Sequence, residues 1–242
     1  AFTGATPQAF GQSNLVVWRV NGTSGSSSAS TNSVASGIVA TAITFGSGVS
    51  AYGISGTLNA IGFNQTSAAD ALTYGDYFEF TAAPAANQSL SFSALNSLLY
   101  RTTNGPERAG WYWNRDNYAA ALASTNSVST NAGGAALNVS FSTNGITSAT
   151  TFRVVVSRSI AISSGTFAIA ATGGTNENPA LTGTVTLRSA ASLAWDGGLG
   201  SGSWTAYDAT NANQANWNGN NTPIDGDTLV FAGTTQTNTT NN

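Results

Sequence analysis

The chain has 242 residues, of which only 7% are charged, far below the roughly 25% of an ordinary soluble domain. Its seven cations are all Arg, since Lys, His, Cys and Met are absent, and ten acids set the net charge at −3 with a pI near 4.6. This composition excludes the basic stripe of a nucleic-acid binder, the His of most general bases, and the His and Cys ligands of transition metals.

Apolar residues make up 41% of the chain, enough to bury a sizeable core, and they alternate with polar residues between clusters of Gly, Asn and Ser. Alternation with a period of two is typical of half-buried strands. We therefore expect an all-β fold, a jelly-roll-like antiparallel β-sandwich. The expected strands cover residues 15–20, 37–45, 54–63, 76–81, 89–95, 98–102, 110–113, 137–141, 151–157, 165–171 and 182–188.

Helical periodicity is nearly absent from the sequence. One helical turn is expected over residues 67–72, where the side chain of Ser67 can cap the first turn. A second is expected near residues 117–122. No run of residues approaches the roughly 20 apolar positions that a membrane-spanning helix needs, so we expect no membrane span.

The composition changes near residue 190, where a Gly-rich stretch with widely spaced Trp begins. We therefore divide the chain into an N-terminal arm (1–12), a β-sandwich domain (13–190) and a small Gly- and Trp-rich C-terminal β segment (191–242). Because the chain opens abruptly with Ala-Phe-Thr-Gly, we expect a mature terminus left by signal cleavage, and hence an extracellular or cell-surface location.

Four acids are candidates for the carboxylate pair of a glycoside hydrolase. They are Asp76, Glu79, Glu107 and Asp116. Alternation places Tyr77 and Glu79 on one strand face, where an Arg such as Arg101 or Arg153 can lie opposite Glu79. We favour this cross-strand ion pair, because the sequence shows no pocket that would raise a carboxyl pKa. We therefore expect no enzymatic activity and no cofactor.

An aromatic run, Trp111, Tyr112 and Trp113, lies between Arg108 and Arg115 and is a candidate platform for a glycan or another partner. Two Trp on one strand face more often belong to the core, so we favour the interpretation that they face inward. In that case Tyr112 alone remains exposed and no Trp platform forms.

The Asp225-Gly-Asp227 run, followed by Thr228, offers few oxygens to Ca²⁺, which needs six to eight ligands. We interpret it as a turn and the start of a strand, and we expect no metal site.

The C-terminal segment carries Trp, Gly, Pro and Asp-Gly-Asp in a fixed order over some 40 residues. The motifs are Trp195-Asp-Gly-Gly, Trp204, Asn216-Trp217-Asn-Gly, Pro223, Asp225-Gly-Asp and Leu229-Val-Phe231. This order resembles the lead-in of autotransporter-associated β-strand repeat proteins, which are large secreted bacterial surface proteins. The resemblance implies export.

A second resemblance covers roughly residues 10–190. It rests on Asp76-Tyr-Phe-Glu-Phe80, Leu90-Ser-Phe, and the stretch from Arg101 through Gly105-Pro106 to Trp113. These motifs resemble the β-sandwich region of secreted, exosortase-sorted (PEP-CTERM type) bacterial proteins. This resemblance also implies export, and neither of the two resemblances implies an enzyme.

We therefore expect a structural protein that assembles with copies of itself into a surface fibre, sheath or matrix. Low charge favours close packing, and an arm at either end could complete the sheet of a neighbour, head to tail. The residues expected to anchor these arms are Phe2, Phe10, Leu229, Val230 and Phe231. The alternative is a carbohydrate-binding or adhesive module that uses the aromatic run at residues 111–113.

Overall fold

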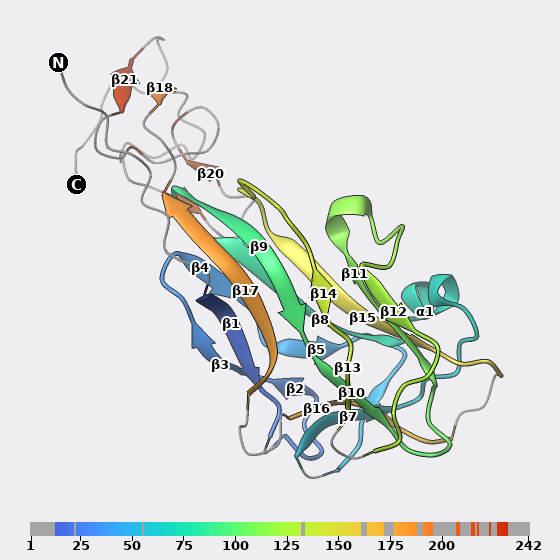
Figure 1. Ribbon diagram of the computed structural model, residues 1–242. Coiled ribbons are helices and arrows are strands. Elements are labelled where there is room, and N and C mark those ends of the chain that lie inside the picture. The colour runs from blue at the N-terminus through green and yellow to red at the C-terminus, as the bar shows by residue number, and fades with distance from the viewer. Residues whose placement is uncertain are drawn as a thin grey trace.

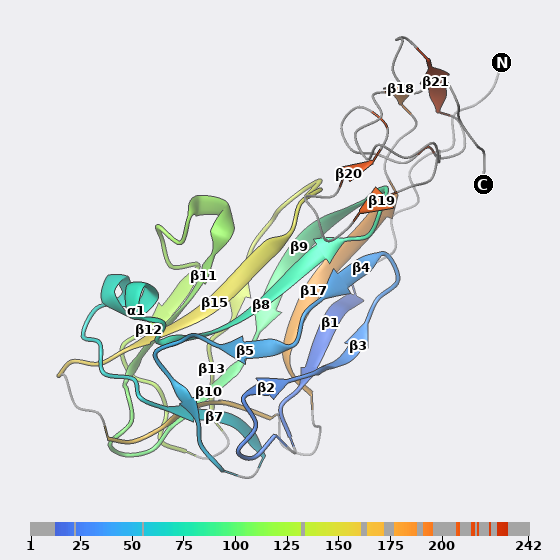
Figure 2. The ribbon, with the colours of Figure 1, turned by 180° about the vertical axis from the view of Figure 1, so that it is seen from behind.

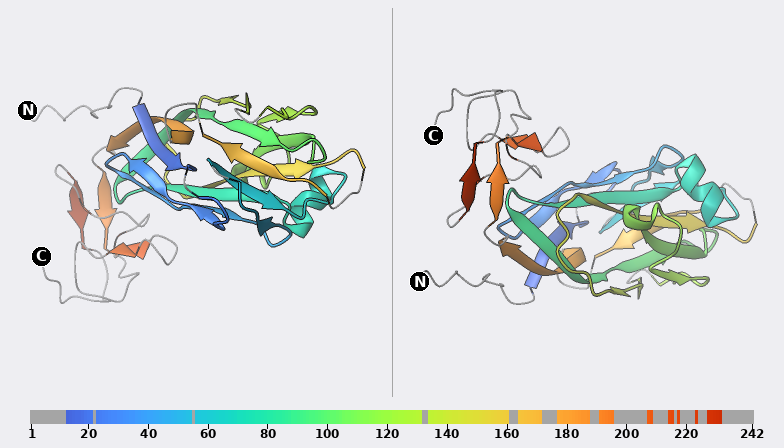
Figure 3. Two further views of the ribbon diagram at one scale, coloured as in Figure 1. Left: turned by 90° about the horizontal axis from the view of Figure 1, so that it is seen from below. Right: turned by 90° about the horizontal axis from the view of Figure 1, so that it is seen from above.

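The computed structural model describes residues 13–21, 23–54, 56–131, 134–160, 164–171, 177–187, 191–195, 207–208, 214–215, 217, 223 and 227–231. These residues form strands arranged mostly in antiparallel sheets, with one short α-helix. Two layers of sheet pack face to face (Figure 3). The predicted all-β sandwich is therefore confirmed.

One layer is a seven-stranded sheet with the order β12-β11-β15-β8-β5-β2, in which β4 also pairs with β8. Its strands are β2 (Ser28–Ala29), β4 (Ile38–Ala40), β5 (Ile43–Phe45), β8 (Tyr77–Pro84), β11 (Arg108–Trp113), β12 (Ala123–Thr125) and β15 (Thr150–Ser157). The predicted strands at 76–81, 110–113 and 151–157 are its three central strands.

The opposite layer contains two five-stranded sheets. The first has the order β14-β9-β17-β1-β3, with β1 (Ser13–Arg19), β3 (Thr31–Val34), β9 (Gln88–Asn96), β14 (Val139–Ser140) and β17 (Glu177–Leu187). The second has the order β13-β10-β16-β7-β6, with β6 (Ser50–Ala51), β7 (Thr57–Ile61), β10 (Leu98–Arg101), β13 (Ala135–Ala136) and β16 (Phe167–Ala170). Only Ser97 separates β9 from β10, so one nearly continuous stretch of chain joins both sheets.

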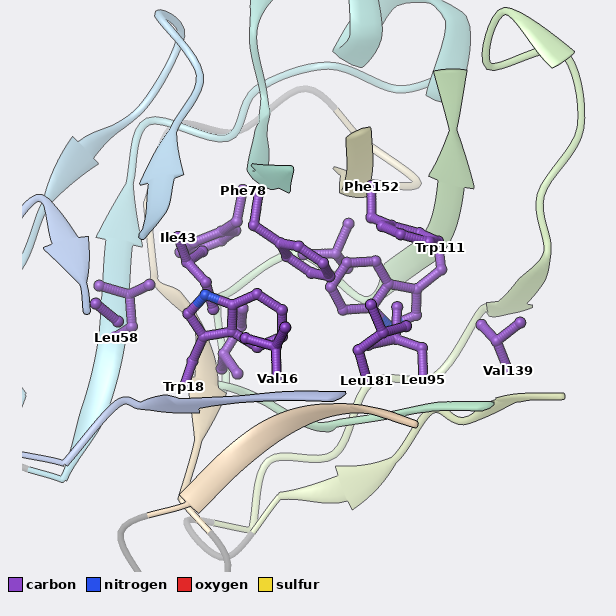
Figure 4. Packing of buried hydrophobic residues seen from close by; sticks show 14 of the residues in the cluster. Val16, Trp18, Ile43, Leu58, Phe78, Leu95, Trp111, Val139, Phe152 and Leu181 are labelled. Atoms are coloured by element: carbon purple, nitrogen blue, oxygen red, sulfur yellow. The ribbon is translucent and has the colours of Figure 1, made fainter. Parts of the chain in front are cut away.

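The space between the layers is filled by aromatic and branched side chains (Figure 4). The Trp18 and Phe80 rings lie 4.1 Å apart between centroids, and Phe80 also stacks on Phe152 at 5.2 Å. The three side chains belong to β1, β8 and β15, which come from both layers. Alternation along each strand thus gives the sandwich its core, without any disulfide.

The predicted helical turn at residues 67–72 is confirmed as α1 (Ala68–Tyr74). The hydroxyl of Ser67 accepts a hydrogen bond from the Asp70 N–H, and Gly75 ends the helix in a left-handed conformation with φ of 86°. Among the described residues, no helix is long and apolar enough to cross a membrane.

The second predicted helix, at residues 117–122, was wrong. The helical turn there is a 3₁₀ turn, η1 (Asn114–Asp116), and it lies before the expected range. It ends at Asn117, whose φ of 58° is left-handed, and Tyr118 follows with φ of 59°. Two consecutive left-handed residues stop helical propagation, because each departs from the right-handed α region.

The C-terminal strands form small sheets beyond one end of the sandwich (Figures 1 and 2). β18 (Ser192–Ala194) pairs in parallel with β21 (Thr228–Val230), and β19 (Tyr207–Asp208) pairs antiparallel with β20 (Gln214–Ala215). Leu193, Trp195 and Trp217 form a second cluster of buried apolar side chains, separate from the main core. The expected strand start after Asp227 is confirmed by β21.

Candidate functional site

A groove of about 310 Å³ on the outer face of the seven-stranded sheet is lined by residues of α1, β11, β12 and β15 and of their flanking loops. Figure 1 shows how these four elements are arranged. Its polar lining groups are hydroxyls, an amide, a phenol and a guanidinium. They belong to Thr66, Ser67, Arg108, Tyr112, Ser124, Thr125, Asn126 and Ser157. We call this the β11 groove. It is concave, and its polar groups come from four separate stretches of the chain, as in many small-molecule sites.

Strand β11 divides the aromatic run between the core and the groove. Trp111 is fully buried, and its Nε1–H donates to the Ser97 hydroxyl over 2.9 Å. Trp113 packs on the core with its ring 5.9 Å from that of Phe141. The two Trp therefore face inward, as we favoured, and Trp111 is not a surface contact. Of the aromatic run, only Tyr112 lines the groove.

Gly110 leaves room for the Tyr112 ring along the surface of the sheet. A Cβ at Gly110 would lie 3.0 Å from Cε2 of Tyr112 and 3.3 Å from the carbonyl oxygen of Ala123. Both contacts are tighter than van der Waals distance. Glycine at this position therefore lets the phenol ring lie over the strand, where it forms a wall of the β11 groove.

Arg108 lines the same groove and is held only weakly. Its Nη1 donates to the carbonyl oxygens of Thr66 and Arg158 over 3.5 and 3.4 Å, and its Nε lies 3.9 Å from Oε1 of Glu107. The Arg108 side chain is 42% exposed. Long hydrogen bonds and high exposure leave this guanidinium able to bind a ligand. The other predicted cation, Arg115, is exposed in η1 and is not among the residues that line the groove.

A cluster on the same face supports the sheet beside Tyr112. Arg153 lies opposite Tyr112 in the neighbouring strand, and its guanidinium carbon is 4.1 Å from the ring centroid of Tyr77 and 4.3 Å from that of Tyr118. Its Nε donates to Oε2 of Glu79 over 2.9 Å. The predicted pairing of Glu79 with an Arg across the sheet is confirmed. We call Tyr77, Glu79, Tyr118 and Arg153 the Arg153 cluster.

The phenols of Tyr112 and Tyr118 are neutral at physiological pH. Burial raises the pKa of Tyr112, and burial also raises the pKa of Tyr118, against the opposing charge of Arg153. Both hydroxyls therefore keep their protons and can donate a hydrogen bond as well as accept one.

Each of the four acids considered for hydrolysis has its own partners. Asp76 is buried and accepts from the N–H groups of Asn64 and Gln65, and burial raises its pKa despite these bonds. Glu79 pairs with Arg153. Burial raises the pKa of Glu107, but the bonds from Ser159 and the charge of Arg108 outweigh it, so the net shift is downward.

The fourth of these acids, Asp116, accepts from the N–H of Ala120 over 3.3 Å. It lies in η1, whereas Asp76 lies just before β8, Glu79 lies in β8 and Glu107 lies just before β11. The four carboxyl groups thus have different partners and lie on different segments, and Oδ1 of Asp116 is buried without a hydrogen bond in the part of the chain that the structure describes.

Of the residues expected in assembly arms, Phe2 and Phe10 lie outside the described residues. Leu229 and Val230 belong to β21, and Leu229 packs on the cluster formed by Leu193, Trp195 and Trp217. The Phe231 ring lies 6.2 Å from that of Trp195 and 5.3 Å from that of Trp217. Val230 and Phe231 nevertheless remain 39% and 53% exposed.

Sequence reasoning missed most of the groove wall. The stretch 124–126 carries no apolar alternation. Ser67 is predicted only as a helix cap, and Thr66 is not predicted as a site residue. Their approach to Tyr112 depends on the fold, since α1 packs against β15 and β12 pairs with β11. Tyr118 reaches Arg153 only because Asn117 and Tyr118 turn left-handed. Nothing in the local sequence signals either contact.

Comparisons with protein-family models, curated proteins and solved structures found no match to this chain. The function is therefore argued from the site itself.

Proposed function

We propose that the chain is an exported, non-enzymatic module that binds carbohydrate in the β11 groove. The observation that carries the proposal is the groove itself, in which Tyr112 and Arg108 lie together with hydroxyl and amide groups. Export is supported by the resemblance of the sequence to secreted surface proteins.

The chemistry of the lining suits a sugar. A pyranose ring offers C–H groups on one face and hydroxyls around its edge, so it needs an aromatic surface and several small hydrogen-bonding groups. Tyr112 supplies the aromatic surface, and Ser67, Ser124 and Asn126 supply hydroxyl and amide groups. The volume of about 310 Å³ falls at the lower end of the range for ligand sites, which is roughly 300 to 1,000 Å³, and suits one or two sugar rings.

The test is binding to an array of oligosaccharides, followed by calorimetric titration of the best ligand. Tyr112→Ala should weaken binding about five- to 150-fold, since stacking on an aromatic ring contributes about 1 to 3 kcal/mol where it has been measured. Tyr112→Phe keeps the ring and should weaken binding only about two- to threefold. The matched control is Tyr74→Ala, because Tyr74 is 60% exposed in α1 and does not line the groove.

Thermal unfolding of each variant shows whether the fold is kept. Absence of binding to any glycan on the array would overturn the proposal, and so would equal affinity of the wild type and the Tyr112→Ala variant.

A second candidate function is self-assembly into a surface fibre, sheath or matrix, and it rests on the C-terminal strands. A pair of three-residue strands is marginally stable by itself. Val230 and Phe231 also leave apolar surface exposed at this pair. A strand from a neighbouring copy would cover that surface and extend the sheet, head to tail, which builds filaments.

Electron microscopy and sedimentation of the full chain test this candidate. Deletion of residues 229–242 should abolish filaments and leave monomers, and deletion of residues 1–12 tests the other arm. Val39→Ser is the matched control, because Val39 is 58% exposed but lies in β4 of the sandwich. Filaments that persist in both deletion variants would contradict the strand-exchange model.

A further inference from the structure

A second cavity lies directly beside the β11 groove and holds two arginines. Its volume is about 400 Å³, and its charged and polar lining includes Arg101, Asn104, Glu107, Arg158, Ser159 and Ser164. We call it the arginine pocket. With two guanidinium groups and one carboxylate, its formal charge is +1.

Among the residues that the structure describes, the two arginines have no ionic partner in direct contact. Within the described ranges, no carboxylate oxygen lies within 4.0 Å of the guanidinium nitrogens of Arg101 or Arg158. Arg158 is only 3% exposed. Its burial lowers its pKa, and the charge of Arg101 lowers it further, while Glu107 and Asp76 act in the opposite direction. The groups that line the pocket therefore carry an excess of positive charge, and the part of it on Arg158 is buried and partly offset by Asp76 outside the pocket.

Both guanidinium groups are fixed in place by backbone carbonyls. Arg158 donates from Nε to Phe63, from Nη1 to Asn104 and from Nη2 to Ser164. Each Nη group carries two hydrogens, so one on each remains for another acceptor.

Arg101 is held in a similar way. It donates from Nε to Val128 over 2.9 Å and from Nη1 to Thr103 over 2.7 Å. Its Nη2 makes no hydrogen bond in the part of the chain that the structure describes. The pocket thus has unused N–H donors on arginines that are already held in position. Ligand binding would therefore cost these side chains little conformational entropy.

The β11 groove and the arginine pocket share one wall. Around the start of β11, Glu107 lines the pocket and Arg108 lines the groove. Around the end of the neighbouring strand β15, Ser157 lines the groove and Arg158 lines the pocket. Arg108 Nη1 donates to the carbonyl oxygen of Arg158 across this wall over 3.4 Å. Two successive units of an oligosaccharide can therefore occupy the two cavities, one in the groove and the next in the pocket.

We infer that the ligand of the β11 groove is an acidic oligosaccharide, and that Arg101 and Arg158 bind the carboxylate of a uronic acid unit in the arginine pocket. This inference rests on the proposed carbohydrate binding and names its ligand class. A carboxylate fits the donors, because guanidinium and carboxylate pair through parallel N–H···O bonds. It also fits the charge, since a monoanion neutralises the formal +1 of the pocket whereas a phosphate dianion exceeds it.

The test compares polyuronate oligosaccharides with their carboxyl-reduced, neutral counterparts and with sulfated oligosaccharides of the same backbone. We expect at least one polyuronate to bind the wild-type chain about tenfold or more tightly than its reduced counterpart. Arg101→Gln should remove this advantage and leave the affinity for the reduced sugar within about twofold. Arg115→Gln is the matched control, because it removes the same charge from an exposed position outside both cavities.

The comparison of acid and reduced sugars on the wild-type chain needs no variant, so it stands even if Arg101→Gln fails to fold. Equal binding of both sugars, lost in Tyr112→Ala, would overturn the acidic ligand and keep the proposed function. If the acid form binds and its binding requires Arg101 but not Tyr112, the carboxylate site in the arginine pocket would be supported. The proposed carbohydrate binding in the β11 groove would be overturned. Preference for the sulfated sugar, or an acid preference that survives Arg101→Gln, would overturn the uronate assignment. Binding of no sugar would overturn both.

Discussion

The two faces of the seven-stranded sheet are built from alternate residues of the same strands, yet they are stabilised in different ways. On the inner face, Phe80 contacts the rings of Trp18, Trp111 and Phe152, with centroids 4.1 to 5.9 Å apart. Each ring has several apolar neighbours, so the face is stabilised by burial, and its contacts need no particular orientation.

On the outer face the contacts are few and directional. Arg153 makes one ion pair, with Glu79, and lies against two phenol rings. Tyr112, next to it, has no ring contact in the part of the chain that the structure describes, and it remains available to the β11 groove. The difference shows that one strand can supply stability from its inner residues and recognition from its outer residues. Substitutions at neighbouring positions should therefore have separable effects.

The largest difference between the effects of inner and outer substitutions on stability is expected in β8. Phe80→Ala should lower the free energy of unfolding by about 3 to 5 kcal/mol, because it removes a fully buried ring and leaves a cavity between the layers. Glu79→Gln, one residue away on the outer face, should lower it by less than about 1 kcal/mol. Urea unfolding followed by Trp fluorescence measures both values. Similar losses from the two substitutions would show that the faces do not differ as argued.

A smaller difference between inner and outer substitutions is expected in β11. Trp111→Phe removes the Nε1–H that donates to the buried Ser97 hydroxyl and leaves space beside it, so it should lower the free energy of unfolding by about 1 to 3 kcal/mol. The Ser97 hydroxyl also donates to the Leu137 carbonyl, so the loss weakens the junction between β9 and β10. Tyr112→Phe should be nearly neutral for stability. A destabilisation by Tyr112→Phe as large as that by Trp111→Phe would mean that Tyr112 belongs to the core.

Much of the fold could be predicted because apolar alternation marks strands that bury one face. The central strands β8, β11 and β15 carry it clearly, as in Phe78 and Phe80 of β8. The strands β2, β3, β6, β12 and β13 escaped prediction. They are two to four residues long and rich in Ser, Thr, Asn and Ala, so backbone pairing rather than side-chain burial forms them.

The candidate site could be predicted only in part. Alternation along β11 separated Tyr112 from the two Trp, and alternation along β8 with a nearby Arg suggested the Glu79 pair. The second wall of the groove comes from α1 and the stretch 124–126, which meet Tyr112 through tertiary packing. The approach of Arg101 to Arg158 likewise depends on two loops far apart in sequence. Tertiary contacts of this kind leave no periodic pattern in the sequence.

A smaller effect is expected within the Arg153 cluster, where a double-mutant cycle can test whether the outer face is truly held by pairwise contacts. The side chains of Arg153 and Glu79 are 21% and 31% exposed, so solvent screens their attraction in part. Glu79→Gln and Arg153→Met, alone and together, should give a coupling energy of about 0.5 to 1 kcal/mol. The single and double variants are compared by urea unfolding at low and high salt. The coupling should shrink at high salt, and additive effects at low salt would contradict the pairing.

The smallest effect concerns Asp76, a buried charge just before β8 and an exception to the apolar character of the buried positions. Burial raises the pKa of Asp76 above its ordinary value, although the N–H groups of Asn64 and Gln65 and the charge of Arg158 oppose the shift. At a pH just above the ordinary value, the unfolded chain has lost this proton while the folded chain still holds it. Folded protein then binds more protons than unfolded protein, so stability falls as pH rises through this window and levels off above the folded pKa.

Asp76→Asn isolates this contribution, since the amide oxygen can still accept from the two N–H groups but the side chain does not titrate. The difference in unfolding free energy, wild type minus Asp76→Asn, should decrease as the pH rises above the ordinary carboxyl pKa of about 4, and it should level off above the raised pKa of the folded state. The subtraction is necessary because the pKa of Glu107 is lowered, so Glu107 contributes a slope of the opposite sign. Urea unfolding at several pH values measures the difference. If it rises with pH instead, the hydrogen bonds and Arg158 outweigh burial, and Asp76 is a stabilising charge rather than an exception tolerated in the core.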